Sequence, residues 1–76
     1  MTREQTIKAM MKKALKITGK NSDNWTRSAE NEIWRMAYDW NDEHEDEEIF
    51  MCEMSKADGD EHDGFCIEDD YFVYEG

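Results

Sequence analysis

The sequence has no proline, only two cysteines and no long run of apolar residues. A membrane-spanning helix needs about 18 or more consecutive apolar residues, so we expect no membrane span. The N-terminal residues lack the charged-then-apolar pattern of a secretory signal, which predicts a cytoplasmic protein. Two cysteines are too few for a disulfide framework. We therefore expect Cys52 and Cys66 to be reduced and to fill space in the core. Pairing of the two tail strands would bring them close, but a disulfide would conflict with a cytoplasmic protein.

Positive charge is scarce in the second half of the chain. Residues 1–35 hold eight Lys or Arg and four Asp or Glu, a net charge of +4. Residues 36–76 hold one Lys and sixteen acids, a net charge of −15, and the two halves sum to −11. Such a chain repels the phosphate backbone, so we expect no direct nucleic-acid binding. The polarised charge favours a basic partner instead.

The length of 76 residues lies near the lower limit for unaided folding and predicts one small acidic domain over residues 1–76. Hydrophobic residues make up only 38% of the chain. Three Trp, three Tyr, three Phe and six Met are present, however. These large side chains can form a core that a disordered acidic chain lacks.

Two helices are predicted in the first half of the chain. Thr2 and Gln5 have the spacing of a capping box and Gly19 suits the residue after a helix, which predicts a helix over 2–18. A short connection to a second helix over about 25–42 predicts antiparallel packing. The first apolar stripe comprises Ile7, Met10, Met11, Ala14, Leu15 and Thr18. The second comprises Trp25, Ala29, Ile33, Met36, Ala37 and Trp40.

The pattern changes near residue 48. Residues 49–52 (IFMC) and 71–74 (YFVY) are short runs typical of strands, and 56–64 and 68–70 resemble turns. The predicted fold class is α+β, with two antiparallel helices followed by a small antiparallel β-hairpin or three-stranded meander. Two alternatives stay open: a third helix over 46–57, and a second helix that continues through the acidic residues beyond 42.

The aromatic residues divide into two expected groups. Trp25 and Trp40 lie on the apolar stripe of the second helix and are predicted to be core. Trp34, Tyr38 and Tyr74 lie toward the edge of the apolar surface. If they are exposed beside acids they could anchor a partner, because Trp and Tyr are enriched at binding hot spots.

Metal and catalytic patterns are weak. An EF-hand loop begun at Asp58 places Asp63 where the invariant Gly belongs. His44, Cys52, His62 and Cys66 could supply zinc ligands, but no two cysteines have the close spacing of a zinc knuckle. No catalytic motif is present. We therefore predict no metal site, no cofactor and no enzymatic activity, and keep a small metal-binding protein as an alternative.

Residues 39–48 hold seven acids in ten positions. If helical, this segment spans about 15 Å and carries one charge per about 2 Å, close to the ~1.7 Å of duplex DNA. In size, acidity and aromatic content the chain resembles phage-encoded DNA-mimic inhibitors, a likeness of composition that no motif carries. The predicted partner-binding residues are Asp39, Asp42, Glu43, Glu45, Asp46, Glu47, Glu48, Asp58, Asp60, Glu61, Asp63, Asp69 and Asp70.

The predicted function is that of a non-enzymatic nucleic-acid (DNA) mimic that inhibits a basic nucleic-acid-binding protein by occupying its basic groove. The alternative is an acidic interaction or immunity-type adaptor anchored by exposed aromatics. A third interpretation is an acidic surface that serves only solubility. A sheet edge could also pair with a second copy to form a homodimer.

Overall fold

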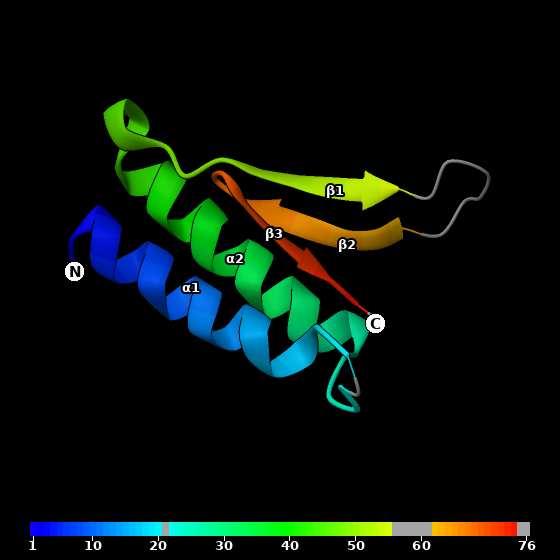
Figure 1. Ribbon diagram of the computed structural model, residues 1–76. Coiled ribbons are helices and arrows are strands. Elements are labelled where there is room, and N and C mark those ends of the chain that lie inside the picture. Colours follow the sequence, from blue (N-terminus) through cyan, green and yellow to red (C-terminus); the bar gives the residue numbers. More distant parts are fainter. Residues whose placement is uncertain (21, 56–61, 75–76) are drawn as a thin grey trace.

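The computed structural model describes residues 1–20, 22–55 and 62–74. Two antiparallel helices, α1 (Arg3–Ile17) and α2 (Arg27–Glu43), lie side by side, and a 3₁₀ turn, η1 (Glu45–Glu47), follows α2 (Figure 1). Strands β1 (Met51–Ser55), β2 (His62–Ile67) and β3 (Asp70–Val73) form an antiparallel sheet in the order β1-β2-β3 that packs on the helices. The predicted α+β fold is confirmed, and its β element is the three-stranded meander.

Local signals set both ends of α1. The Thr2 backbone N–H donates to Gln5 Oε1 at 2.9 Å, and the Gln5 backbone N–H donates to Thr2 Oγ1 at 3.1 Å, which completes the predicted capping box. After the helix, Gly19 has φ +96°, a conformation that glycine adopts without steric cost. The Gly19 N–H donates to Val73 O at 2.6 Å, which ties the end of α1 to β3.

One residue of the first predicted stripe lies elsewhere. Leu15 is 70% exposed, whereas Met10, Ala14 and Ile17 are buried. The buried residues follow the i, i+4, i+7 spacing, and Leu15 is rotated away from them by about 100°. The prediction of Leu15 as part of the apolar stripe is therefore wrong, and Ile17 takes its place.

The positions at which α2 starts and ends differ from the expectations for Trp25 and for the residues beyond 42. Thr26 caps the helix by accepting a hydrogen bond from the Ala29 N–H at 3.0 Å, so Trp25 lies outside it. Trp25 is 37% exposed rather than core, and its ring packs on Tyr74 with centroids 4.8 Å apart. At the other end the chain leaves the helix at His44, so α2 does not continue through the acids. The alternative third helix over 46–57 is also wrong, because β1 occupies residues 51–55.

The core lies between the helices and one face of the sheet. Phe65 faces Phe72 in the strand register, and Ile67 pairs with Met51. Met10, Ala14 and Ile17 from α1, Ile33, Ala37 and Trp40 from α2, and Ile49, Phe65, Ile67 and Phe72 form the buried cluster. Trp40 is core as predicted. None of the described helices is long and apolar enough to cross a membrane.

The opposite face of the sheet carries the two cysteines. Cys52 and Cys66 are direct cross-strand partners and form a disulfide. The expectation of reduced cysteines is therefore wrong, although Cys66 is buried as predicted, with 2% exposure. The sequence could not show the pairing, because it depends on the register in which β1 meets β2.

Candidate functional site

Nine of the predicted partner-binding acids gather at one end of the molecule. They lie on the last turns of α2, on η1 and the residue after it, and on the β2–β3 turn and the first residue of β3, near the start of α1 (Figure 1). All nine are exposed. This acidic end comprises Asp39, Asp42, Glu43, Glu45, Asp46, Glu47, Glu48, Asp69 and Asp70.

The remaining predicted acids do not belong to the acidic end. Asp63 lies near the start of β2, whereas the acidic end adjoins its other terminus. The Asp63 backbone oxygen accepts a hydrogen bond from the Tyr74 N–H at 2.8 Å. Asp58, Asp60 and Glu61 lie outside the described residues.

Two side chains of α2 anchor the backbone that follows it. The Trp40 Nε1–H donates to Glu47 O at 2.8 Å. Asn41 makes two bonds to Ile49: its Nδ2 donates to Ile49 O at 3.1 Å, and its Oδ1 accepts from the Ile49 N–H at 2.7 Å. These bonds fix the irregular segment 44–50, whose polar backbone groups would otherwise lack partners.

Arg3 of α1 joins two parts of the acidic end. Its Nε donates to Glu47 O at 3.2 Å, and its Nη2 donates to Glu48 O at 3.0 Å. The same guanidinium pairs with the carboxylate of Glu68, in the β2–β3 turn. Glu68 has φ 56°, a conformation unusual for a residue other than glycine, and its N–H donates to Phe50 O at 2.8 Å. Arg3 thus holds η1 and the β2–β3 turn together.

The seven acids of residues 39–48 keep their carboxylates free. Within the described part of the chain, none of them makes an ion pair or a side-chain hydrogen bond. Asp39, Asp42 and Glu43 lie on α2, whereas the chain leaves the helix at His44 and Glu45–Glu47 form the separate turn η1. The continuous helical row of charges considered for residues 39–48 is therefore not present.

The position of these acids opposes helix stability. Asp42 and Glu43 occupy the last turn of α2, which has no basic residue, and the helix dipole disfavours anions there by about 0.3–1 kcal/mol each. Asp39 and Glu43 are like charges at i, i+4, which adds about 0.2–0.5 kcal/mol. The acidic end therefore lowers the stability of the fold by roughly 1–2 kcal/mol through α2 alone.

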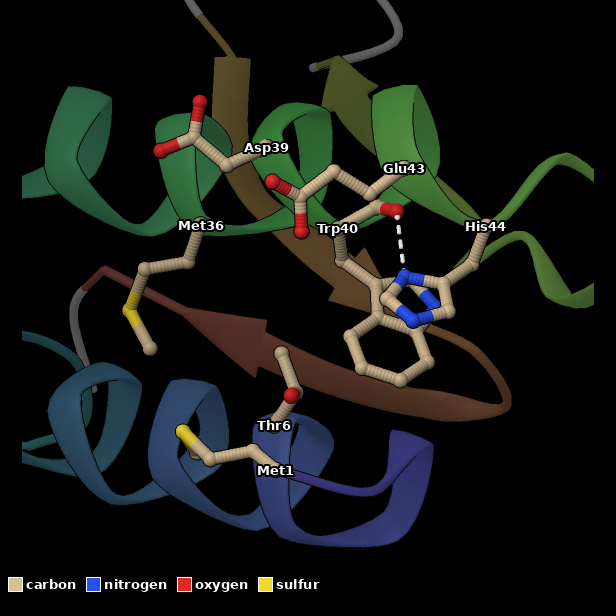
Figure 2. Close-up of a pocket in the computed structure, with 7 residues that line it drawn as sticks. All are labelled: Met1, Thr6, Met36, Asp39, Trp40, Glu43 and His44. Carbon is tan, nitrogen blue, oxygen red and sulfur yellow. Dashed lines mark hydrogen bonds between the residues drawn. The ribbon is translucent and has the colours of Figure 1, made fainter.

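A groove of about 360 Å³ opens beside the acidic end, between α2 and the start of α1 (Figure 2). Its walls include Met1, Thr6 and Met36, and the carboxylates of Asp39 and Glu43 stand at its rim. Trp40 and His44 close one side. The two rings are stacked with centroids 3.6 Å apart and an 8° interplanar angle. His44 Nδ1 also lies 3.1 Å from Trp40 O.

Exposed aromatics occupy a second surface, formed by α2 and the segment leading into β1. Tyr38 is 63% exposed and Phe50 is 59% exposed. Trp34 lies beside Tyr38 with ring centroids 6.0 Å apart. Together they line a shallow hollow of about 340 Å³ between α2 and the segment leading into β1. The structure confirms that Trp34 and Tyr38 lie at the edge of the apolar surface.

Glu30 is a buried acid that the sequence analysis missed. It is 1% exposed and accepts a hydrogen bond from the Trp34 Nε1–H at 3.3 Å. Tyr74 also hydrogen-bonds to it. Burial of the phenol raises the pKa of Tyr74 well above its ordinary value, and the Glu30 carboxylate raises the pKa further. The only signal in the sequence was the spacing of Glu30 three residues before Ile33, on the apolar face.

No group of three or more metal-ligating side chains comes together within residues 1–20, 22–55 and 62–74. Of the zinc set, Cys52 and Cys66 are joined to each other as a disulfide. Most of the calcium-like loop at 58–64 lies outside the described residues.

Comparison with known proteins adds no functional information. No family model matches the chain, and no curated protein or solved structure is significantly similar to it.

Proposed function

We propose that this protein is a non-enzymatic, phage-encoded inhibitor that mimics nucleic acid. Its acidic end occupies the basic groove of a nucleic-acid-binding protein, such as a nuclease or a polymerase factor, and displaces the nucleic acid. The carboxylates of the acidic end replace phosphates opposite Lys and Arg of the partner, which raises the association rate as well as the affinity.

The observation that carries this proposal is the free state of the carboxylates. The segment 44–50 is held by donors that bind its backbone oxygens, as Trp40 does at 2.8 Å from Glu47 O. Seven exposed acids lie within the ten residues 39–48, on the last turns of α2 and on the segment that follows it. Acids placed only for solubility need neither this density nor a position at a helix C-terminus, where they reduce stability.

The first test is capture of partners from the lysate of the native host at low and high salt, followed by mass spectrometry. We expect proteins that bind nucleic acid, released by salt and by added duplex DNA, because screening weakens exposed charge pairs. Retained proteins that resist both treatments would contradict the proposal.

The second test measures association with the captured protein. A triple variant, Glu43→Gln, Asp46→Asn and Glu47→Gln, should associate at least tenfold more slowly at low salt, since steering depends on local charge. A control variant with the same charge change outside the acidic end is Asp23→Asn, Glu32→Gln and Glu53→Gln. Equal rates for both variants would contradict a role for the acidic end.

The exposure of Tyr38 and Phe50 supports a second candidate, an adaptor anchored by aromatics. Its binding would be nearly independent of salt and would be lost in the variant Tyr38→Ala, Phe50→Ala. Measuring binding affinity as a function of salt concentration therefore distinguishes the two candidates.

We also propose a cytoplasmic site of action. Disulfides are rare in that compartment, so the Cys52–Cys66 disulfide counts against this site of action, and the proposal holds only if both cysteines are found reduced in the cell. Thiol labelling in acid-quenched cells measures their state, and a fully oxidised pair would indicate an oxidising compartment.

A further inference from the structure

We propose that the groove beside the acidic end, shown in Figure 2, is a docking site for one arginine side chain of the basic partner. This inference rests on the proposed function and assigns a specific contact within it.

The lining of the groove fits a side chain that is apolar along its length and cationic at its tip. Met1 and Met36 offer thioether side chains, which adapt to an aliphatic stem. At the rim, Asp39 and Glu43 project from successive turns of α2 (Figure 2). Neither carboxylate has an ion-pair partner within the described residues. Apolar contact and charge complementarity therefore point to the same occupant.

Arginine fits this arrangement better than lysine. Its planar guanidinium carries five N–H donors, so one head group can bind two carboxylates on adjacent helical turns, whereas an ammonium acts as a point charge. Its head group is also more weakly hydrated, which favours contact with the apolar wall. The stack of His44 on Trp40, with centroids 3.6 Å apart, gives that wall a fixed shape.

The groove differs from the rest of the acidic end in placing two carboxylates beside an apolar wall. Glu45, Asp46 and Glu47 lie on η1, none of whose residues is buried. Asp69 and Asp70 are likewise exposed, in and beside the β2–β3 turn. Glu48 borders the hollow beside Tyr38 and Phe50, but it is the one acid lining it, whereas Asp39 and Glu43 border the groove together. Among the described residues, the groove is therefore where two of these carboxylates stand beside space for an aliphatic stem.

The test uses N-acetylarginine amide as the probe, titrated into the full ¹⁵N-labelled chain at constant ionic strength. We expect saturable shifts at the Trp40 indole N–H and at the Met36 and His44 amides, with a dissociation constant in the millimolar range. N-acetyllysine amide should bind several-fold more weakly, and the uncharged citrulline analogue should cause no saturable shift. Equal shifts by the lysine and arginine probes, or shifts spread evenly over Glu45–Glu48, would overturn the assignment.

Two variants that remove the same amount of charge distinguish binding in the groove from general attraction to the acidic end. Asp39→Asn with Glu43→Gln should weaken binding of the arginine probe about tenfold, whereas Asp69→Asn with Asp70→Asn should weaken it about twofold, because a distant exposed charge is screened. Equal losses would overturn the groove as a site.

The same pair of variants distinguishes failure of this inference from failure of the proposed function. If both variants slow association with the captured partner equally, the acidic end binds without a specific arginine and only the groove assignment fails. If neither variant changes association, the proposed function fails.

Discussion

Replacing Arg3 by Ala removes a side chain that bridges η1 and the β2–β3 turn. Two hydrogen bonds are lost, to Glu47 O at 3.2 Å and to Glu48 O at 3.0 Å, together with the ion pair to Glu68. Bonds with a charged donor contribute about 1.5–3 kcal/mol when well buried. The Arg3 side chain is 36% exposed, so we take about 1 kcal/mol for each bond. The partly exposed ion pair to Glu68 adds up to ~1 kcal/mol.

The expected net loss for Arg3→Ala is about 2 kcal/mol, because a cation in the first turn of α1 opposes the helix dipole and its removal returns up to ~0.5 kcal/mol. For a chain of this length each kcal/mol shifts Tm by about 4–8 °C, so Tm should fall by roughly 10 °C. Thermal unfolding followed by circular dichroism at low salt measures the change.

Lys8→Ala is the matched control for Arg3→Ala. Lys8 lies on the same helix, is exposed, carries the same charge and has no bonding partner within the described residues. Its loss should change Tm by less than about 3 °C, since isolated surface substitutions alter stability by about 0.5 kcal/mol or less. If the two variants have the same Tm, Arg3 acts only through its charge and does not anchor the acidic end.

Three further predictions concern the stability of the fold. Gly19→Ala should lower the free energy of unfolding by about 1 kcal/mol in urea titration, because φ is +96° while nothing lies within 4 Å of the added Cβ; an unchanged midpoint would contradict this. Glu30→Ala should lower it by about 2–4 kcal/mol, since Trp34 and Tyr74 lose an acceptor, and Glu30→Gln should lower it less. The raised pKa of Tyr74 favours its neutral form in the fold, so its contribution is complete below pH ~10 and is lost as pH rises further. Tyr74→Phe should therefore flatten the decline of Tm above pH ~10, and an unaltered slope would refute the assignment.

Several features that depend on neighbours in the sequence were predicted well, but the turn predicted at 56–64 is wrong over residues 62–64, which belong to β2. The capping box of Thr2 with Gln5 and the stop at Gly19 formed as expected, because their hydrogen bonds and dihedral angles involve residues a few positions apart. The turn at 68–70 was also located, since polar residues separate two apolar runs there. The exposure of the acids at 39–48 followed from the cost of burying a charge.

Features that depend on distant pairing were not predictable in the same way. The hydrogen bonds of Arg3 reach residues 44 and 45 positions away, and nothing local distinguishes this cation from the lysines of α1. The Cys52–Cys66 disulfide requires a particular register between two strands. Glu30 is buried because Trp34 and Tyr74 supply its donors, and the second donor comes from the far end of the chain.

The way in which the acidic end is held bears on how it can act. Anchoring by lysine–carboxylate pairs would stabilise the segment and also neutralise it. Here the donors of Trp40, Asn41 and Arg3 bind backbone oxygens instead, at 2.8 to 3.2 Å. The backbone is thereby ordered, which reduces the entropy lost when a partner binds, while the carboxylates keep their full charge. A partner that supplies cations would relieve the repulsion at the end of α2, so part of the stability that the acids remove from the free protein would be returned on binding. The complex should accordingly melt at a higher temperature than the free protein, and this increase should shrink in the triple variant Glu43→Gln, Asp46→Asn, Glu47→Gln.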